Sequence, residues 1–338
     1  MRRLSETTTS PLPADRHAES ALAAVVPPSG PRRIGLRQRA LSGVATTFSE
    51  LLGSRATQAF GIVRYHRVTE IMDGIEPPPW NVTPDRFGQQ LEGLLERGFE
   101  AWRLREVLAH ASEGRPLPPR VFVITFDGAY ESVYLNAFPI LRRLEVPATV
   151  FLATAYLDSD APLPGDDWAA AGFDRVPYTA WRSLTTAECR EMQKSGLIEL
   201  GAHTHTYGDF RGRPAALASD LRRCRRVLRE QFGIERPTFA FPDGAHEAAC
   251  CGPELSGIVR ESGLLCALSS EPRLVRPGTS PFEWGRFTAE QHDSPGSLAA
   301  KLNGWHEAVR SIGQSILRRN VRAAPISDAV DVLETKPV

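Results

Sequence analysis

Short apolar runs alternate with longer amphipathic stretches along most of this chain. Runs such as 121–126 (VFVITF) and 198–202 (IELGA) are each followed by a stretch with apolar residues at helical spacing. This alternation indicates parallel strands joined by crossover helices, because a strand covered on both faces is apolar throughout. Seven or eight such units predict an α/β fold, a distorted (β/α) barrel with seven or eight strands. The predicted strands are 61–65, 99–102, 121–126, 148–153, 198–202, 238–241, 264–268 and 284–287, and the predicted helices are 34–52, 83–97, 134–144, 185–195, 214–232, 253–262 and 297–309.

The two ends of the chain do not share this pattern. Residues 1–33 are rich in Pro, Ser, Thr and Ala without periodicity, which is typical of a disordered tail. We expect an accessory helix within 34–56, since apolar positions recur there at helical spacing and Gly53 follows them. One barrel domain over 57–325 and a flexible carboxyl end at 326–338 complete the predicted organisation.

Charge and cysteine content exclude some classes of function. Forty Lys and Arg balance forty Asp and Glu, so no net positive field draws the chain to nucleic acid. Five cysteines without a CxxC pair favour free thiols over a disulfide framework or a zinc ribbon. No apolar run approaches the ~18 residues of a membrane span, and none has the length of a signal peptide. We therefore predict a cytoplasmic protein without a transmembrane segment.

Histidines and acids stand where the predicted strands end. In α/β barrels the reactive groups lie just past the carboxyl ends of the strands. Imidazoles and carboxylates that meet there from separate strands are the groups that metal-assisted hydrolysis needs. The candidates are His66, Asp127, His203, His205 and Asp243.

Several segments resemble the polysaccharide deacetylase (NodB-homology) family of carbohydrate esterases. They are IVRYHRV (62–68), TPDRFGQQLEGLLERGFE (83–100), VFVITFDGAYESVYLNAFPILRRLEVPATVFLAT (121–154), IELGAHTHTYGDF (198–210), RPTFAFPDGA (236–245) and FEWGRFTAEQHDSPGSLAAKLNGW (282–305). The resemblance implies the NodB-type distorted barrel. It also implies hydrolysis of an acetyl group from an N-acetylated or O-acetylated sugar, with a divalent zinc, cobalt or nickel ion as the cofactor.

The active-site motifs depart from the family pattern at two positions. The family has Thr-Phe-Asp-Asp-Gly-Tyr, whereas residues 125–130 read Thr-Phe-Asp-Gly-Ala-Tyr. By the resemblance, Asp127 keeps the place of the general base and Gly128 replaces a metal-binding carboxylate. In the second motif His203 keeps one metal-binding place and Tyr207 replaces the other histidine. A phenol is a poor zinc ligand beside imidazole and carboxylate, so most of the metal affinity is expected to be lost.

A relocated metal site is one interpretation of these replacements. His203 and His205 would bind the metal together with His66 and with Asp127 or Asp243. Residues two apart on an extended segment point to opposite faces, so the two histidines share a metal only if their segment curls.

Two other interpretations need no metal. In one, Asp127 acts as base and His66 or His292 as acid on an altered substrate. In the other, the barrel is a catalytically degenerate homologue that serves as a sugar-binding or regulatory module. Tyr130, Pro242, Asp243 and Trp284 are the residues expected to contact an acetylated sugar or glycan. The sequence leaves the oligomeric state open.

Overall fold

The computed structural model describes the barrel and a short helical piece before it. The described residues are 43–47, 49, 58–75, 77–78, 80–166, 168, 176–242, 252–305 and 307–308. Residues 43–47 are helical, within the predicted accessory helix. The predicted tail at 1–33, the carboxyl end at 326–338 and Asp243 lie outside the described residues.

A parallel sheet in the order β7-β6-β5-β1-β8 forms the centre of the molecule, and β4 also pairs with β5. Single parallel bridges extend it, from Ala202 to Phe239, from Ala240 to Leu268 and from Leu268 to Trp284. Because Trp284 leads into β8, which pairs with β1, these bridges bring the ring back to its first strand. The predicted distorted barrel is confirmed. Its strands are β1 (Gly61–Tyr65), β4 (Glu100–Ala101), β5 (Val121–Phe126), β6 (Ala148–Leu152), β7 (Ile198–Ala202) and β8 (Phe287–Thr288), and β2 (Arg67–Val68) pairs separately with β3 (Asn81–Val82).

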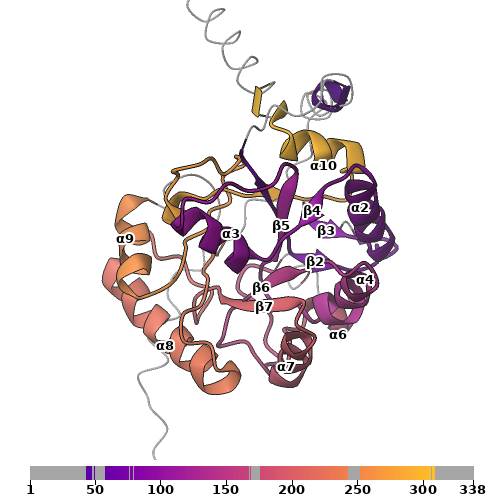
Figure 1. Ribbon diagram of the computed structural model, residues 1–338. Helices are drawn as coiled ribbons and strands as arrows, with labels where there is room; N and C mark the ends of the chain where they lie inside the picture. Colours follow the sequence, from indigo (N-terminus) through magenta and orange to yellow (C-terminus); the bar gives the residue numbers. More distant parts are fainter. Residues whose placement is uncertain are drawn as a thin grey trace, which may run out of the picture.

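Helices surround the strands on the outside, with α2, α4 and α10 on one side and α8 and α9 on another (Figure 1). The helices are α2 (Pro84–Glu96), α3 (Leu104–Ser112), α4 (Phe138–Arg143), α6 (Tyr178–Trp181), α7 (Thr186–Lys194), α8 (Pro214–Phe232), α9 (Pro253–Glu261) and α10 (Pro295–Leu302). A π-helical turn (Val133–Ala137) precedes α4, and a 3₁₀ turn (Pro281–Glu283) precedes β8. Within the described part of the chain, none of the helices has the length and apolarity needed to cross a membrane.

Local sequence explains where these elements start and stop. Thr185 caps α7 through a capping box with Glu188, which satisfies backbone N–H groups at the start of the helix. Gly233 ends α8 in the left-handed region, at φ 68°, where glycine has no steric penalty. Every residue of β1 and β5 is buried, so their mostly apolar character reflects helices or loops on both faces.

The structure differs from the predicted elements after β7. The predicted strands 238–241 and 264–268 are reduced to single bridges, and the last strand begins at Phe287 instead of Trp284. Helix α3 was not predicted. Only Leu104, Val107 and Leu108 of its nine residues are buried, so its apolar pattern in the sequence is short.

Candidate functional site

Asp127 lies directly after β5 at the carboxyl end of the strands, and its side chain is completely buried. Arg286 donates to both carboxylate oxygens, from Nη1 to Oδ1 at 2.6 Å and from Nη2 to Oδ2 at 2.7 Å. Arg64, from β1, places its Nη1 3.8 Å from Oδ2. The carboxylate is therefore held in a two-pronged ion pair by one arginine and lies near the charge of a second.

These charges determine the ionisation of Asp127. Burial by itself would raise the pKa of the carboxyl group, because a low-dielectric surrounding disfavours the charged form. The charge of Arg286, with smaller contributions from His203 and Arg64, outweighs burial and holds the pKa of Asp127 well below its ordinary value. Asp127 is thus ionised at neutral pH and weakly basic.

His203 follows β7 and faces the same carboxylate. Its Nε2 lies 4.0 Å from Oδ2 of Asp127, and its Nδ1 lies 2.8 Å from the carbonyl oxygen of Ala240. A carbonyl only accepts, so Nδ1 carries the hydrogen of that bond. The ring of Tyr207 packs edge-to-face on the imidazole at 5.2 Å. Asp127 and His203, which follow β5 and β7, therefore lie close together in the structure.

Position 128 has no room for a side chain. Gly128 has φ +88°, a backbone conformation that other residues rarely adopt. A Cβ atom there would lie 2.9 Å from Cε2 of Tyr130 and 3.1 Å from Cδ1 of Leu163. The space that a side chain at position 128 would enter is therefore occupied by the side chains of Tyr130 and Leu163.

The residues around Asp127 do not fit a divalent metal. Gly128 offers no donor, Tyr207 contributes a ring contact, and Asp127 is committed to Arg286. Among the described residues no group of three or more His, Cys, Asp and Glu side chains is placed to hold a metal ion. Two guanidinium groups at this point would also repel a cation.

A cluster around Arg67 covers the opening of the barrel. Arg67 is fully buried and pairs with Asp166. Its guanidinium lies over three aromatic rings, 4.9 Å from the centroid of Trp80, 4.3 Å from that of Tyr130 and 4.2 Å from that of Trp168. The hydroxyl of Tyr130 donates to Asp166 at 2.9 Å, and burial together with the Asp166 charge raises the pKa of Tyr130 well above its ordinary value. Tyr130 therefore holds the protein's own carboxylate, although we predicted it as a sugar contact.

The other predicted histidines have separate partners. His66 is buried and its ring lies 5.1 Å from that of Trp80, at the covered opening. His205 contacts Thr154 Oγ1 through Nδ1 at 2.9 Å, and burial lowers its pKa. His292 lies 3.1 Å from Glu290 Oε2 on the loop after β8. The relocated set of His203, His205 and His66 is not brought together as a ligand group among the described residues.

Trp284 is a correction to the predicted sugar contacts. Its ring packs edge-to-face against Phe60 at 5.3 Å in the core, and its indole N–H donates to the carbonyl of Thr279. Only 1% of the residue is exposed, so its ring is not available to a sugar. Pro242 is also buried.

The sequence analysis did not identify Arg64 and Arg286 as partners of Asp127, although the sequence contains a pattern that indicates this role. Each arginine interrupts an apolar run, GIVRY in β1 and WGRF before and within β8. A buried arginine needs an acidic partner, because an unpaired charge in the interior is very costly. Asp127, at the end of another strand of the same sheet, is that partner.

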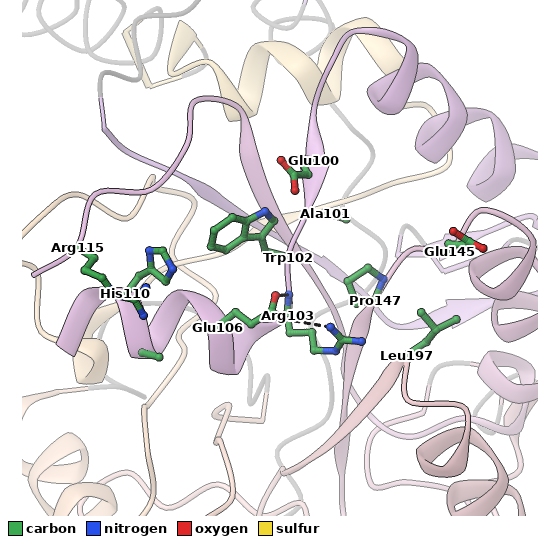
Figure 2. Close-up of a pocket in the computed structure, with 11 residues that line it drawn as sticks. Glu100, Ala101, Trp102, Arg103, Glu106, His110, Arg115, Glu145, Pro147 and Leu197 are labelled. Carbon is green, nitrogen blue, oxygen red and sulfur yellow. Dashed lines mark hydrogen bonds and ion pairs between the residues drawn. The ribbon is translucent and has the colours of Figure 1, made fainter. Parts of the chain in front are cut away.

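A hollow lies at the opposite end of the barrel, near the amino ends of β5, β6 and β7. It has a volume of about 570 Å³, with Trp102, His110 and Arg115 on one side and Glu145, Pro147 and Leu197 on the other (Figure 2). Its charged residues are largely exposed, and Arg103 and Glu106 pair with each other at 3.0 Å. No buried polar group of the described residues distinguishes this hollow from an ordinary solvated surface.

Comparisons with known proteins agree with the motifs. Residues 114–252 match the family model for polysaccharide deacetylase. Poly-beta-1,6-N-acetyl-D-glucosamine N-deacetylase of Staphylococcus aureus is 24% identical over 237 residues, which cover 68% of this chain and 74% of that protein. The structure of IcaB from Ammonifex degensii is similar with a TM-score of 0.59 and 24% identity, covering 74% of this chain and 97% of that one. A de-N-acetylase from Aggregatibacter actinomycetemcomitans has a TM-score of 0.60 at 17% identity, covering 72% and 100% of the two chains.

Proposed function

Because this chain belongs to the polysaccharide deacetylase family, we propose that it is a polysaccharide deacetylase-like protein that binds an N-acetylated glucosamine polymer without hydrolysing it. Of the interpretations left open by the sequence, this corresponds to the degenerate homologue with a sugar-binding role. The proposed ligand class is an oligomer of β-1,6-linked N-acetylglucosamine, after the substrate named for the Staphylococcus relative.

The ion pair of Asp127 with Arg286 is the observation that carries this proposal. A general base must reach a water molecule and take its proton. Both oxygens of Asp127 accept from Arg286, the side chain has no exposed surface, and its pKa is held low. A carboxylate in this state is a poor base, because binding a proton would break a buried ion pair.

The ligand positions support the same proposal. Metal-dependent relatives would use the places of Gly128 and Tyr207, where this chain has no donor and a packed ring. We therefore propose that the protein works without a resident zinc, cobalt or nickel ion.

Aromatic rings at the opening provide a surface for a sugar. Trp80, Tyr156 and Tyr207 are partly buried rings, and each keeps some exposed surface. They pack against the buried cluster of Tyr130, Ala153 and Leu163. Aromatic rings combine a large apolar face with a polar edge, which suits the apolar face and hydroxyl rim of a pyranose. A glycan lying across these three rings would not need to reach Asp127.

The test measures binding and acetate release in the same samples. β-1,6-linked N-acetylglucosamine tetramer is titrated by calorimetry, and acetate release is followed with and without added Zn²⁺, Co²⁺ or Ni²⁺. We expect binding without acetate release. Replacing the ring at the opening, Tyr207→Ala, should weaken binding about tenfold, which is the ~1.4 kcal/mol expected for one aromatic contact. Tyr134→Ala removes a half-buried ring whose hydroxyl donates to Glu191 of α7 and which is not among the three rings at the opening, so it should leave affinity unchanged.

Acetate release that disappears in Asp127→Asn would contradict the proposal. It would instead establish Asp127 as the base of an active deacetylase. Failure of the tetramer to bind at millimolar concentration would exclude the glycan class. A cytoplasmic location remains part of the proposal, and fractionation of the cells that make the protein tests it.

A further inference from the structure

The segment 153–166, which follows β6, lies across the opening of the barrel. Leu163 is 2% exposed and packs with Tyr130 and Ala153. It is the side chain that a Cβ atom at Gly128 would meet at 3.1 Å. The segment therefore fills the space directly in front of position 128 with its own apolar side chain.

The amino half of this segment is bonded to the residues after β7 and before α7. The N–H groups of Thr154 and Ala155 donate to the carbonyls of Thr204 and His205 at 3.3 and 2.9 Å, and Asp158 N–H donates to that of Leu184 at 3.3 Å. The carboxylate of Asp158 also accepts from the N–H of Thr186 at 2.8 Å. Its carboxyl end is instead held by a side chain, since Asp166 pairs with Arg67 and accepts from Tyr130 and from the backbone N–H of Trp168. One buried ion pair thus joins the carboxyl half of the segment to the strand β2.

The buried cation is incompletely hydrogen-bonded in this closed arrangement. Nε and Nη1 of Arg67 have no hydrogen-bond partner among the described residues, and the same is true of Nε1 of Trp168. Buried donors without acceptors carry a desolvation cost that water would remove on opening. The three ring faces offset part of that cost, since a cation over an aromatic face is stabilised. The difference in free energy between the closed and open arrangements is consequently smaller than the burial of the ion pair alone would suggest.

We propose that residues 153–166 form an internal plug, that the Arg67–Asp166 pair is its latch, and that a glycan gains full access to the opening only when the latch releases. The entry role rests on the proposed function, whereas the latch itself does not. In the closed state the glycan meets only the outer parts of Trp80, Tyr156 and Tyr207. In the open state Leu163 leaves the space in front of Gly128.

Hydrogen exchange of the full chain tests the latch without any ligand. The variants are Asp166→Asn, which keeps the shape of the side chain, and the double variant Arg67→Met with Asp166→Asn, which leaves no unpaired charge. The control is Arg143→Met, which removes an exposed pair with Glu92. We expect the amides of Ala155 and Asp158 to exchange at least about tenfold faster in both latch variants, with α8 unchanged. Circular dichroism identifies any variant that does not fold. If Asp166→Asn does not fold, the exchange rates of the double variant test the latch.

Binding of the β-1,6-linked N-acetylglucosamine tetramer tests the entry role. When only the open fraction binds fully, the apparent dissociation constant is the intrinsic one divided by that fraction. The latch variants should therefore bind the tetramer at least about fivefold more tightly than the parent, and Arg143→Met should bind like the parent. Folded latch variants with unchanged exchange over 153–166 would overturn the latch. Faster exchange with unchanged affinity would overturn the entry role. If no form binds the tetramer, the proposed function fails and the exchange rates still decide the latch.

Discussion

Replacing Arg286 by Met isolates the ion pair on which the interpretation of Asp127 depends. Met is similar in length and apolar, so the change removes the guanidinium while leaving the packing of β8 largely intact. Asp127 then stays buried without its two-pronged partner, with Arg64 at 3.8 Å and His203 at 4.0 Å as the remaining cationic or polar neighbours.

The expected loss of stability is large. Removing one partner of a buried pair costs about 3 to 5 kcal/mol, and the residual charge of Arg64 favours the lower end of that range. For a domain of this size a loss of about 3 kcal/mol lowers the melting temperature by about 6 to 12 °C. The double variant Arg286→Met with Asp127→Asn should recover part of the loss, since it buries no unpaired charge.

The pH dependence provides a second measurement with a defined sign. In the parent protein the pKa of Asp127 is lowered, so its stabilising contribution is complete above about pH 4 and is lost as the pH falls further. Without Arg286 the effect of burial dominates and the folded-state pKa rises above the unfolded value. The variant then gains stability as the pH falls from 7 towards 4, and its deficit relative to the parent becomes smaller.

Chemical denaturation of parent and variant at pH 7 and pH 5 checks both expectations. Arg143→Met serves as the control, because its partner Glu92 is exposed and such pairs contribute ~0 to 1 kcal/mol. A loss below about 1 kcal/mol for Arg286→Met, or a deficit that grows at pH 5, would refute the assignment of Asp127 as a locked carboxylate.

Three further expectations concern other parts of the site. Gly128→Ala should lower the free energy of unfolding by about 1 to 3 kcal/mol more than Gly114→Ala does. Both positions have positive φ, but only position 128 is crowded. Equal melting temperatures of the two variants would disprove the crowding. Gly285→Ala should destabilise the protein by about 1 to 3 kcal/mol, since its Cβ would lie 2.2 Å from the carbonyl oxygen of Glu271, and an unshifted denaturation midpoint would count against this. The three described cysteines are buried and burial raises their pKa values, so at most two of the five thiols should react with Ellman's reagent before unfolding. Labelling of more than two thiols in the native protein would contradict this burial. The three described cysteines are Cys189, Cys224 and Cys266.

The strands were predictable wherever a helix or loop covers both faces. The observed bounds 61–65, 121–126 and 198–202 coincide with the predicted ones, because an uninterrupted apolar run has no other stable place than a buried strand or helix. The prediction failed after β7, where single bridges at Phe239, Ala240 and Leu268 replace continuous strands. Short apolar runs do not encode how many residues actually pair, since that depends on the curvature of neighbouring strands.

The sequence predicts the position of the site in the barrel. It does not predict which groups pair with Asp127 or which side chains fill the opening. The carboxyl ends of parallel barrel strands lie at one end of the barrel, so Asp127 after β5 and His203 after β7 were expected at the same end. The sequence motif could not show that Arg286, 159 residues further along the chain, would bond to Asp127. Nor could it show that Leu163 would fill the space before Gly128, because the segment that carries it has no periodic pattern. The motif therefore predicts where the site lies, but its chemical state depends on ion pairs between residues far apart in the sequence.

Gly128, Tyr207 and the two arginines Arg64 and Arg286 together set the charge balance of the site. A buried carboxylate requires a cation, and Arg286 supplies it through two short hydrogen bonds. A metal arriving at the same place would compete with that guanidinium for the same oxygens and would meet the charge of Arg64 as well. Restoring Gly128→Asp and Tyr207→His would thus supply donors without removing the competing cation. It would also place a side chain against Leu163. The pairing of Asp127 with Arg286 and the side chains that fill the opening consequently bear on the proposed function as much as the residue types at 128 and 207 do.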